Sequence, residues 1–343
     1  MMKILRYLLF PFAILYDVIT RIRNFCFDVG FFKQTRFKIP VIVVGNLSVG
    51  GTGKTPQVEY LIRLLKDSYK LATVSRGYGR KTKGYFLANN THTSKDIGDE
   101  PLQYFNKFDT VNVAVAEKRV LGISNILRNT SSEIVLLDDA YQHRNVKGSF
   151  YVLLTKYNDL FVNDFLLPTG NLRESKKGAQ RTDVIVVTKC PKNLKDRSKK
   201  AIQYKLKKYN KKIFFTTISY DETTSGSEQI YVNDLKNYTV LLVTGIANPS
   251  PMLSFLEEKE VRVRHLKFPD HHAFSIKEIQ TITTKYHKLK ASKKILLTTE
   301  KDYVRLSTQI DNISFLGIKT SFLDNKGKEF DELIMRHIQQ NQR

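Results

Sequence analysis

The chain has 343 residues, and its 56 Lys and Arg against 33 Asp and Glu give a formal net charge of +23. The length indicates about two domains, and 41% hydrophobic with 11% aromatic residues excludes wholesale disorder and collagen-like or low-complexity classes. Two cysteines cannot build a disulfide framework and fit two buried, reduced thiols, while the charge predicts an anionic partner: nucleic acid, an acidic membrane surface or a phosphorylated substrate.

The N-terminal segment, residues 3–23, predicts an amphipathic helix. Pro11 predicts a kink, and the interruptions of the apolar run argue against a secretory signal and against a spanning helix. On a helical wheel one side carries Lys3, Arg6, Asp17, Thr20 and Arg21, and another carries Ile4, Leu8, Phe12, Leu15, Ile19 and Ile22. Two placements fit this pattern. The helix packs on the core, or it lies at a membrane interface, held by its apolar face and by basic residues facing anionic lipid.

A phosphate-binding loop follows an apolar, strand-like run at 39–46. The segment 48–55 matches G-x-x-x-x-G-K-[ST], except that Ser48 replaces the first glycine. Backbone N–H groups form such a cradle, so a serine is compatible with it. Lys54 is expected at the β- and γ-phosphates, with the Thr55 hydroxyl on Mg²⁺. The nucleotide-binding residues are then Ser48, Val49, Gly50, Gly51, Thr52, Gly53, Lys54 and Thr55. A glycine-rich loop with an incidental lysine is the alternative.

The rest of the chain predicts two α/β domains. Apolar runs alternating with helical stretches indicate a mostly parallel sheet covered on both faces. Further strands are expected at 70–80, 110–119, 133–144, 149–155 and 183–189. We expect an N-terminal helix at 1–24, a P-loop domain at 25–220 joined by a C-terminal helix at 324–343, and a smaller α/β domain at 221–323. The runs 212–220 and 313–323 predict a two-stranded link, and the basic run 189–212 predicts a solvated helix or, alternatively, a lipid- or phosphate-facing patch.

Two acidic pairs are candidates for chemistry beside the loop. Asp138 and Asp139 lie in the predicted strand 133–144, after its apolar run, where P-loop enzymes hold Mg²⁺. Adjacent strand residues point to opposite faces, so one of the two is expected to meet the ion. Asp99 and Glu100, in the segment GDEP at 98–101, can supply a base for phosphoryl transfer. These four residues alone also fit a loop or a helix N-cap.

A histidine pair forms the third candidate segment. His271 and His272 follow Asp270. A metal site needs further ligands that the sequence does not supply nearby, so a structural or exposed pair is the first interpretation.

The motifs together resemble one family. The segments GNLSVGGTGKTP, SRGYGR, GDEP, DDAYQHR, LPTGNLRE and TTEKD run in order between about residues 40 and 305. This set resembles the tetraacyldisaccharide 4′-kinases, the lipid A 4′-kinases of Gram-negative envelope synthesis. Many members have DDGFQHR, so Ala140 and Tyr141 are mild departures. The resemblance implies a membrane-associated, monotopic P-loop kinase at the cytoplasmic face of the inner membrane. It would use ATP and Mg²⁺ to phosphorylate the 4′-hydroxyl of an acylated glucosamine disaccharide 1-phosphate.

The resemblance also implies roles for single residues. Asp99 would be the catalytic base, paired with His271 or, as second choice, His272. Lys54 would act on the transferred phosphoryl group. The metal residues would be Thr55, Glu100, Asp138 and Asp139. The acceptor would contact Arg76, Tyr78, Gln142, His143, Arg173 and Glu174, each of which alone also fits a surface or capping residue.

Two other functions fit parts of the sequence. A membrane-associated P-loop nucleotide switch or binding module needs no lipid kinase activity and leaves Asp99 as a cap. A nucleic-acid-dependent ATPase is suggested only by the basic balance, and no recognisable nucleic-acid motif supports it. The expected partners are therefore the acylated disaccharide phosphate and an anionic membrane surface, without nucleic acid.

Overall fold

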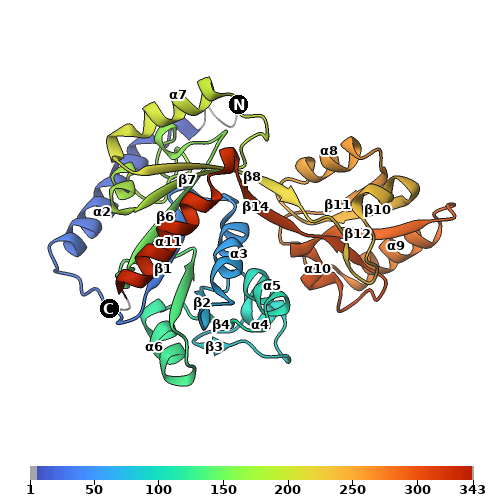
Figure 1. Ribbon diagram of the computed structural model, residues 1–343, viewed down its shortest axis with the longest axis horizontal. Coiled ribbons are helices and arrows are strands. Elements are labelled where there is room, and N and C mark those ends of the chain that lie inside the picture. The colour runs from blue at the N-terminus through green and yellow to red at the C-terminus, as the bar shows by residue number, and fades with distance from the viewer. Residues whose placement is uncertain (1–5, 342–343) are drawn as a thin grey trace.

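The structure is a computed structural model that describes residues 6–341. Its strands form two sheets, one of nine strands and one of five. The sheets lie in two bodies joined by two long strands, β8 (Lys212–Tyr220) and β14 (Ile318–Phe322), which pair antiparallel (Figure 1). Helices flank both sheets, so the α/β, P-loop-like fold class predicted from the sequence is confirmed.

The larger sheet is built around β1 (Val41–Asn46), in the order β14-β8-β7-β6-β1-β5-β2-β4-β3. Its inner strands run parallel, whereas β14 and β3 pair antiparallel at the two ends. The remaining strands are β2 (Leu71–Ser75), β3 (Phe86–Leu87), β4 (Asn112–Val115), β5 (Ile134–Asp138), β6 (Phe150–Lys156) and β7 (Val184–Thr188). Parallel strands gather their carboxyl ends at one edge, which is where ligands bind in such sheets.

The prediction of a strand over 133–144 is wrong beyond Asp138. There β5 ends, and Asp139 adopts a φ of 47°, a left-handed conformation that a strand cannot continue through. The following segment turns back across the end of the sheet. This turn carries Gln142 and His143 to the edge at which the phosphate loop begins.

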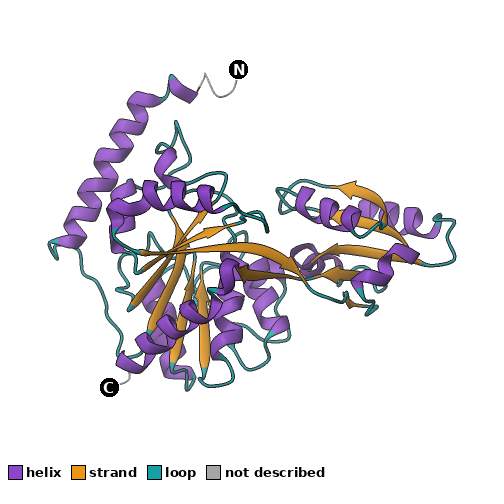
Figure 2. Ribbon diagram, turned by 45° about the horizontal axis from the view of Figure 1, so that its top comes forward, coloured by secondary structure: helices purple, strands orange, loops and turns teal. Residues whose placement is uncertain are grey.

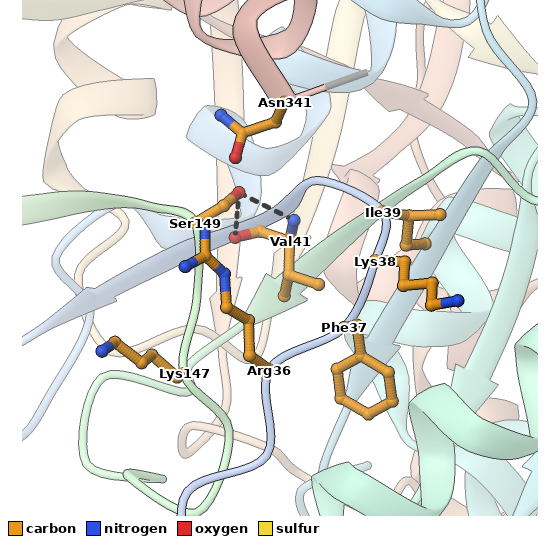
Figure 3. A pocket seen from close by; sticks show the side chains of 8 residues that line it. All are labelled: Arg36, Phe37, Lys38, Ile39, Val41, Lys147, Ser149 and Asn341. Atoms are coloured by element: carbon orange, nitrogen blue, oxygen red, sulfur yellow. Dashed lines mark hydrogen bonds between the residues drawn. The ribbon is translucent and has the colours of Figure 1, made fainter. Parts of the chain in front are cut away.

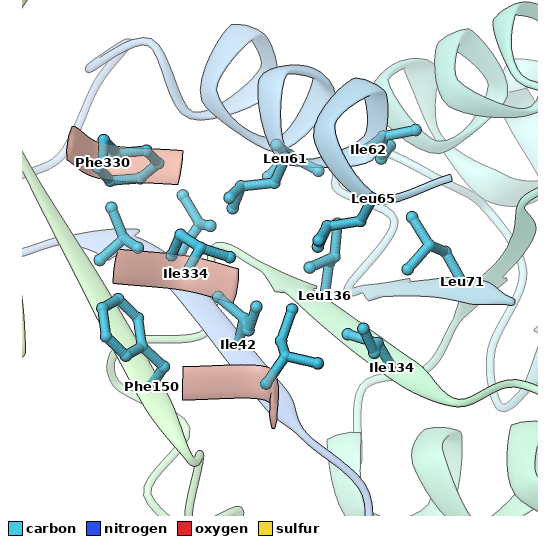
Figure 4. Packing of buried hydrophobic residues seen from close by; sticks show 14 of the residues in the cluster. Ile42, Leu61, Ile62, Leu65, Leu71, Ile134, Leu136, Phe150, Phe330 and Ile334 are labelled. Atoms are coloured by element: carbon cyan, nitrogen blue, oxygen red, sulfur yellow. The ribbon is translucent and has the colours of Figure 1, made fainter. Parts of the chain in front are cut away.

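Side chains along each strand point alternately to the two faces of the larger sheet, so a hydrophobic core forms on each face. Ile42 and Val44 of β1 belong to one buried cluster, and Val41 and Val43 belong to another on the opposite face. Helices α3 (Lys54–Leu65) and α11 (Gly327–Asn341) cover the first face, with Leu61, Leu65, Phe330 and Ile334 fully buried (Figure 4). The other helices of this body are α4 (Ser94–Ile97), α5 (Asp99–Lys107), α6 (Arg119–Asn129) and α7 (Asp196–Leu206).

The basic run 189–212 contains α7, with Ile202 and Leu206 buried. Most of its lysines are exposed, as expected for a solvated helix. Of the two free cysteines, Cys190 is buried, whereas Cys26 is half-buried rather than fully buried as predicted.

The smaller sheet has the order β11-β10-β12-β13-β9. Its strands are β9 (Ser225–Gly226), β10 (Thr239–Thr244), β11 (Arg262–Lys267), β12 (Lys294–Thr299) and β13 (Ser314–Leu316), and only β9 runs antiparallel to its neighbour. Helix α8 (Ser250–Glu258) packs on one face, and α9 (Ile276–His287) and α10 (Glu300–Leu306) pack on the other. Val304 of α10 also packs against Leu102 of α5, which joins the two bodies.

Helix α2 (Phe10–Asp28) runs along the outside of the larger body (Figure 2). A turn at Leu8 and Leu9 precedes it, and Pro11 lies in the first turn of α2, where a residue without an N–H is tolerated. Lys3 and Ile4 of the predicted wheel lie outside the described residues.

The apolar side of α2 faces away from the protein. Its predicted apolar positions within the described residues are 55% to 72% exposed; they are Leu8, Phe12, Leu15, Ile19 and Ile22. Thr20 of the polar side is buried, and the Tyr16 hydroxyl and Arg23 donate to the carbonyl oxygens of Arg173 and Gln142 at 2.9 and 2.8 Å. Of the predicted polar side, Thr20 therefore faces the protein, whereas the basic residues Arg6 and Arg21, which were predicted to face lipid, are exposed. Within residues 6–341, every helix is too short or too polar to cross a membrane.

Candidate active site

The phosphate loop joins β1 to α3 at the carboxyl edge of the larger sheet. Gly50 and Gly53 have φ of +92° and +84°, which favour glycine over any residue with a Cβ. The Thr188 hydroxyl, at the end of β7, donates to the carbonyl oxygen of Thr52 at 2.7 Å and so fixes the loop against the sheet. Lys54 begins α3, whose first N–H groups are free to bind phosphate.

Asp138 and Asp139 stand in different environments. Asp138 is 5% exposed, and the Tyr104 hydroxyl donates to its Oδ2 at 3.1 Å, while Oδ1 lacks a hydrogen-bond partner among the described residues. Burial, followed by the charge of Asp139, raises the pKa of Asp138 to about 6. Desolvation also acts on Asp139, but the charges of Lys54 at 3.5 Å and Arg173 at 2.8 Å outweigh it and lower the pKa of that carboxyl.

These carboxylates fit a magnesium ion better than a metal that needs a complete protein cage. Within residues 6–341, no group of three or more His, Cys, Asp or Glu side chains forms a ready metal site. Mg²⁺ in P-loop proteins takes few protein ligands, because waters and phosphate oxygens complete its shell. The buried, unpartnered Oδ1 of Asp138 supplies one such ligand beside the phosphate loop.

Asp99 is held by groups from both bodies. It begins α5 after Gly98, whose φ is +93° and where a Cβ would lie 3.0 Å from the Tyr78 carbonyl oxygen. Asp99 is 6% exposed, and its Oδ2 lies 3.0 Å from Nδ1 of His271. Arg305 of α10 donates from Nε to Oδ1 at 2.7 Å and from Nη2 to Oδ2. Desolvation opposes ionisation, but these hydrogen bonds and charges lower the pKa of Asp99 to about 2.

His271 rather than His272 contacts Asp99. Nδ1 of His271 lies 3.0 Å from Oδ2 of Asp99 and also 3.0 Å from Nη2 of Arg305, while Nζ of Lys301 lies 2.9 Å from its Nε2. His272 instead pairs with Glu278 at 3.0 Å and stacks on Phe268. Between the two histidines left open by the sequence, the geometry favours His271.

Other predicted residues surround Asp99 and the acidic pair. Tyr78 is 70% exposed, and its ring centroid lies 5.4 Å from that of His271. Arg76 is exposed on the same loop. Arg173 joins Asp139 to Asn46 at the end of β1, and Glu100 pairs with Lys301 at 3.2 Å.

The remaining predicted acceptor residues lie beneath α2. Gln142 donates from Nε2 to the carbonyl oxygen of Asn46 at 2.9 Å and to Glu174 at 3.0 Å. Glu174 is 2% exposed, and both of its oxygens are engaged, by Gln142, Arg181 and Asn24 of α2. Burial, followed by Arg119 and Arg76, lowers the pKa of His143 to about 4. The segment under α2 is therefore tied to the acidic pair through Asn46 and Arg173.

Sequence reasoning assigned no role to Arg119 or Arg305 and included Lys301 only as part of the motif TTEKD. Lys301 and Arg305 are four residues apart on α10, a spacing that places them on one helix face and could have indicated a joint role. Arg119 is the last residue of the predicted strand 110–119, but β4 ends at Val115 and Arg119 begins α6; it is 3% exposed, with Nε and Nη2 lacking partners among the described residues. A cation at the carboxyl end of a parallel strand was the available signal.

A buried charge network links the two bodies beside this site. Nζ of Lys107 on α5 lies 2.8 Å from Glu59 of α3 and 2.5 Å from Glu300 of α10. Burial, with the nearby charge of Glu59 next, raises the pKa of Glu300 to about 7, and Lys107 opposes this while Asp221 adds to it.

Glu300→Gln is expected to gain stability relative to the wild type as pH rises. The folded-state pKa lies above the ordinary 4.5, so folding takes up a proton in this window and wild-type stability falls from about pH 4.5 to about pH 7. The shift in the pKa of Glu300 corresponds to roughly 3 kcal/mol of folding stability. The wild type loses this stability across the pH window, and the glutamine variant keeps it. Urea unfolding at pH 5 and pH 8 measures the gap between the two proteins, and an equal gap at both values would contradict the assignment.

Two cavities lie outside the phosphate loop. One of about 300 Å³ lies between the end of α2 and the turn after β5, lined by Phe27, His143 and Arg144 among others. The other, of about 390 Å³, lies where β1 begins, with Arg36, Lys147 and Ser149 around it (Figure 3). The second cavity is at the amino ends of the strands, so it is separate from the candidate active site.

The fold and the site define a class. A parallel sheet with a phosphate loop after its central strand, and acidic side chains at the end of the adjacent strand, is the construction of P-loop nucleotide-binding proteins. Comparison with known proteins identifies the family within this class. The family model described as tetraacyldisaccharide-1-P 4′-kinase matches residues 5–339, and the chain belongs to this family.

Known relatives match this chain over nearly its full length. The tetraacyldisaccharide 4′-kinase of Flavobacterium psychrophilum is 51% identical, over 98% of each chain, and that of Flavobacterium johnsoniae is 49% identical, over 99% of each. A crystal structure of LpxK from Aquifex aeolicus in complex with ATP is similar with a TM-score of 0.78 and 31% identity, over 97% of this chain and 99% of that one. The family predicted from the motifs is confirmed.

Proposed function

We propose that the chain transfers the γ-phosphoryl group of ATP to the 4′-hydroxyl of tetraacyldisaccharide 1-phosphate in lipid A biosynthesis. Family membership supports this activity. The observation that carries it is a buried carboxylate, Asp99, held by His271 and Arg305 of the second body at the phosphate-loop edge. A nucleotide switch has no need of such an assembly.

Asp99 accepts the proton of the 4′-hydroxyl in this proposal. Phosphoryl transfer passes through a loose transition state, so the hydroxyl gives up its proton late, after it has become acidic. A carboxylate of low pKa is then basic enough, and its orientation matters more than its strength. Arg305 keeps Asp99 ionised, and His271, with Nδ1 3.0 Å from Oδ2, fixes the direction of that carboxylate.

Lys54 and the phosphate loop hold the triphosphate, and Asp138 with Thr55 holds Mg²⁺, which neutralises phosphate charge when bound. We favour Asp138 over Asp139 for the ion, because Oδ1 of Asp138 is unpartnered whereas Asp139 contacts Lys54 and Arg173. Glu100, in the first turn of α5, is the further metal candidate.

The acceptor is proposed to lie between Tyr78 and the segment beneath α2. Arg76, Arg173 and His143 offer donors for sugar and phosphate oxygens, and arginine binds such oxygens in pairs. Gln142 is held by Glu174, whose oxygens are both engaged, so Glu174 acts by fixing Gln142 and Arg181.

The exposed apolar side of α2 is proposed to enter the surface of the inner membrane, on its cytoplasmic face. Five apolar side chains there face away from the protein, and the opposite side of the helix contacts residues proposed to bind the acceptor. A lipid substrate would thus reach the site from the membrane along this helix.

The double variant Leu15→Asp, Ile19→Asp is expected to bind vesicles of anionic phospholipid at least ~10-fold more weakly. Each exposed side chain contributes about 1.5–3 kcal/mol when buried in an apolar phase. The fold should persist, because both residues are exposed. Ile276→Asp, at an even more exposed apolar position on α9, is the control and should sediment like the wild type. Equal sedimentation of all three proteins would remove α2 from membrane binding.

The activity itself is tested with purified protein, ATP, Mg²⁺ and tetraacyldisaccharide 1-phosphate dispersed in detergent. The 1,4′-bisphosphate is the expected product. No product in a dispersion where the Flavobacterium psychrophilum relative turns over would reject the proposal. ATP hydrolysis without a phosphorylated lipid would favour the nucleotide switch instead.

A further inference from the structure

Three lysine side chains, not one, surround the phosphate loop. Lys54 belongs to the loop motif. Nζ of Lys156 lies 3.8 Å from the position that a Cβ on Gly50 would occupy, and Nζ of Lys189 lies 3.9 Å from the corresponding position on Gly51. Lys156 and Lys189 therefore contact the loop at two successive glycines.

The sheet topology brings these two lysines to the loop. Lys156 is the last residue of β6, and Lys189 directly follows β7. The order β7-β6-β1 aligns their carboxyl ends with the start of the phosphate loop. Lys189 has a φ of 56°, an uncommon conformation for lysine, directly after Thr188, whose hydroxyl bonds the loop carbonyl of Thr52. The backbone conformation of Lys189 is thus fixed close to the loop.

The charges around the loop are unbalanced. Lys54 has Asp139 at 3.5 Å and Lys156 has Asp159 at 3.6 Å, but Lys189 forms no ion pair with any residue from 6 to 341. Desolvation, followed by the charges of Lys156 and Lys54, lowers the pKa of Lys189. Cations that repel one another in the free protein are stabilised when an anion enters between them.

We propose that Lys189, assisted by Lys156, binds the polyphosphate of the nucleotide and extends the cradle beyond Lys54 and the loop N–H groups. The proposal rests on the use of ATP by this chain. It assigns these two lysines to phosphate recognition rather than to packing of the loop or contact with the base. A charge role predicts dependence on the number of phosphates and on salt, which packing of a lysine stem does not.

Lys189→Met keeps most of the side-chain stem and removes the charge, and Lys195→Met, an exposed lysine before α7, is the control with the same loss of charge. Calorimetric titration of the full chain with ATP, ADP and adenosine is the measurement. A charge-assisted contact is worth about 1.5–3 kcal/mol, so Lys189→Met should weaken ATP roughly 10-fold or more, ADP less, and adenosine not at all. Lys189→Arg should restore part of the ATP affinity.

Thermal unfolding separates this role from a structural one. Without nucleotide, Lys189→Met should be at least as stable as the wild type, because one repelling charge is gone, and with ATP it should gain less stability than the wild type. Equal weakening of ATP and adenosine, an unchanged ATP affinity, or a variant that unfolds more readily without nucleotide would each overturn the proposal. Binding is measured without lipid, so failure of lipid phosphorylation is recorded separately.

Discussion

Asp99→Asn is expected to lower kcat for lipid phosphorylation by ~10²–10⁴-fold while leaving ATP affinity nearly unchanged. The amide cannot accept the hydroxyl proton. ATP affinity should persist because Asp99 stands at the start of α5, whereas the phosphate loop starts α3. Steady-state kinetics with varied lipid and ATP, together with ATP titration, measure both quantities.

The same variant tests how the two bodies cooperate. Asp99 offers two acceptor oxygens to Arg305 and His271, and asparagine offers one. Thermal unfolding is therefore recorded alongside the kinetics, with Asp109→Asn as a control at an exposed aspartate beyond the end of α5. A kcat within tenfold of the wild type would show that Asp99 is not the base, whereas lost ATP affinity would show that it shapes the nucleotide site.

In the proposed mechanism, catalysis depends on both bodies. The first supplies Asp99 and the phosphate loop, and the second supplies His271, Lys301 and Arg305. Strands β8 and β14 join the bodies, while α5 packs on α10 directly beside the site. Motion at this interface would move the donors that orient Asp99, so the interface can gate the reaction.

Local patterns were sufficient to predict the sheet and the loop. The apolar run before Ser48 and the glycines after it fix a strand, a loop and a helix within about twenty residues, and each element depends on its neighbours in sequence. The end of β5 was mispredicted, because Asp139 turns to meet Lys54 and Arg173, and both partners are distant in sequence.

Periodicity showed that α2 has two faces but not which one faces the protein. The side that carries Tyr16, Arg23 and Asn24 lies inward because these residues donate to backbone carbonyls and to a buried carboxylate on the larger body. The pairing of Asp99 with His271, across 172 residues, came only from the family resemblance. Arg305 was not predicted as a site residue, and Lys189 was not predicted as a neighbour of the phosphate loop, because domain docking brings the first into place and strand order the second.

Lys54→Met is expected to lower kcat by ~10²–10³-fold and to weaken ATP binding as well. Removing one preorganised charge from the place where negative charge develops has effects of this size. Nothing in the fold should fail, because Asp139 retains Arg173 at 2.8 Å and is not left as an unpaired acid. Lys54→Arg should restore little activity, since a planar guanidinium cannot replace a compact ammonium group against a tight glycine loop.

A comparison of Lys54→Met with Lys189→Met separates the roles of the two lysines. Charge that acts equally on bound ATP and on the transition state changes affinity and leaves kcat alone, whereas charge that acts on the moving phosphoryl group lowers kcat at saturating ATP. Lys189→Met, outside the loop motif, should therefore change the affinity for ATP and leave kcat alone. Lys54→Met should change the affinity and also lower kcat. If Lys54→Met changes only the affinity for ATP, then the loop lysine binds phosphate without contributing to transfer, and Arg119 becomes the buried cation to test in its place.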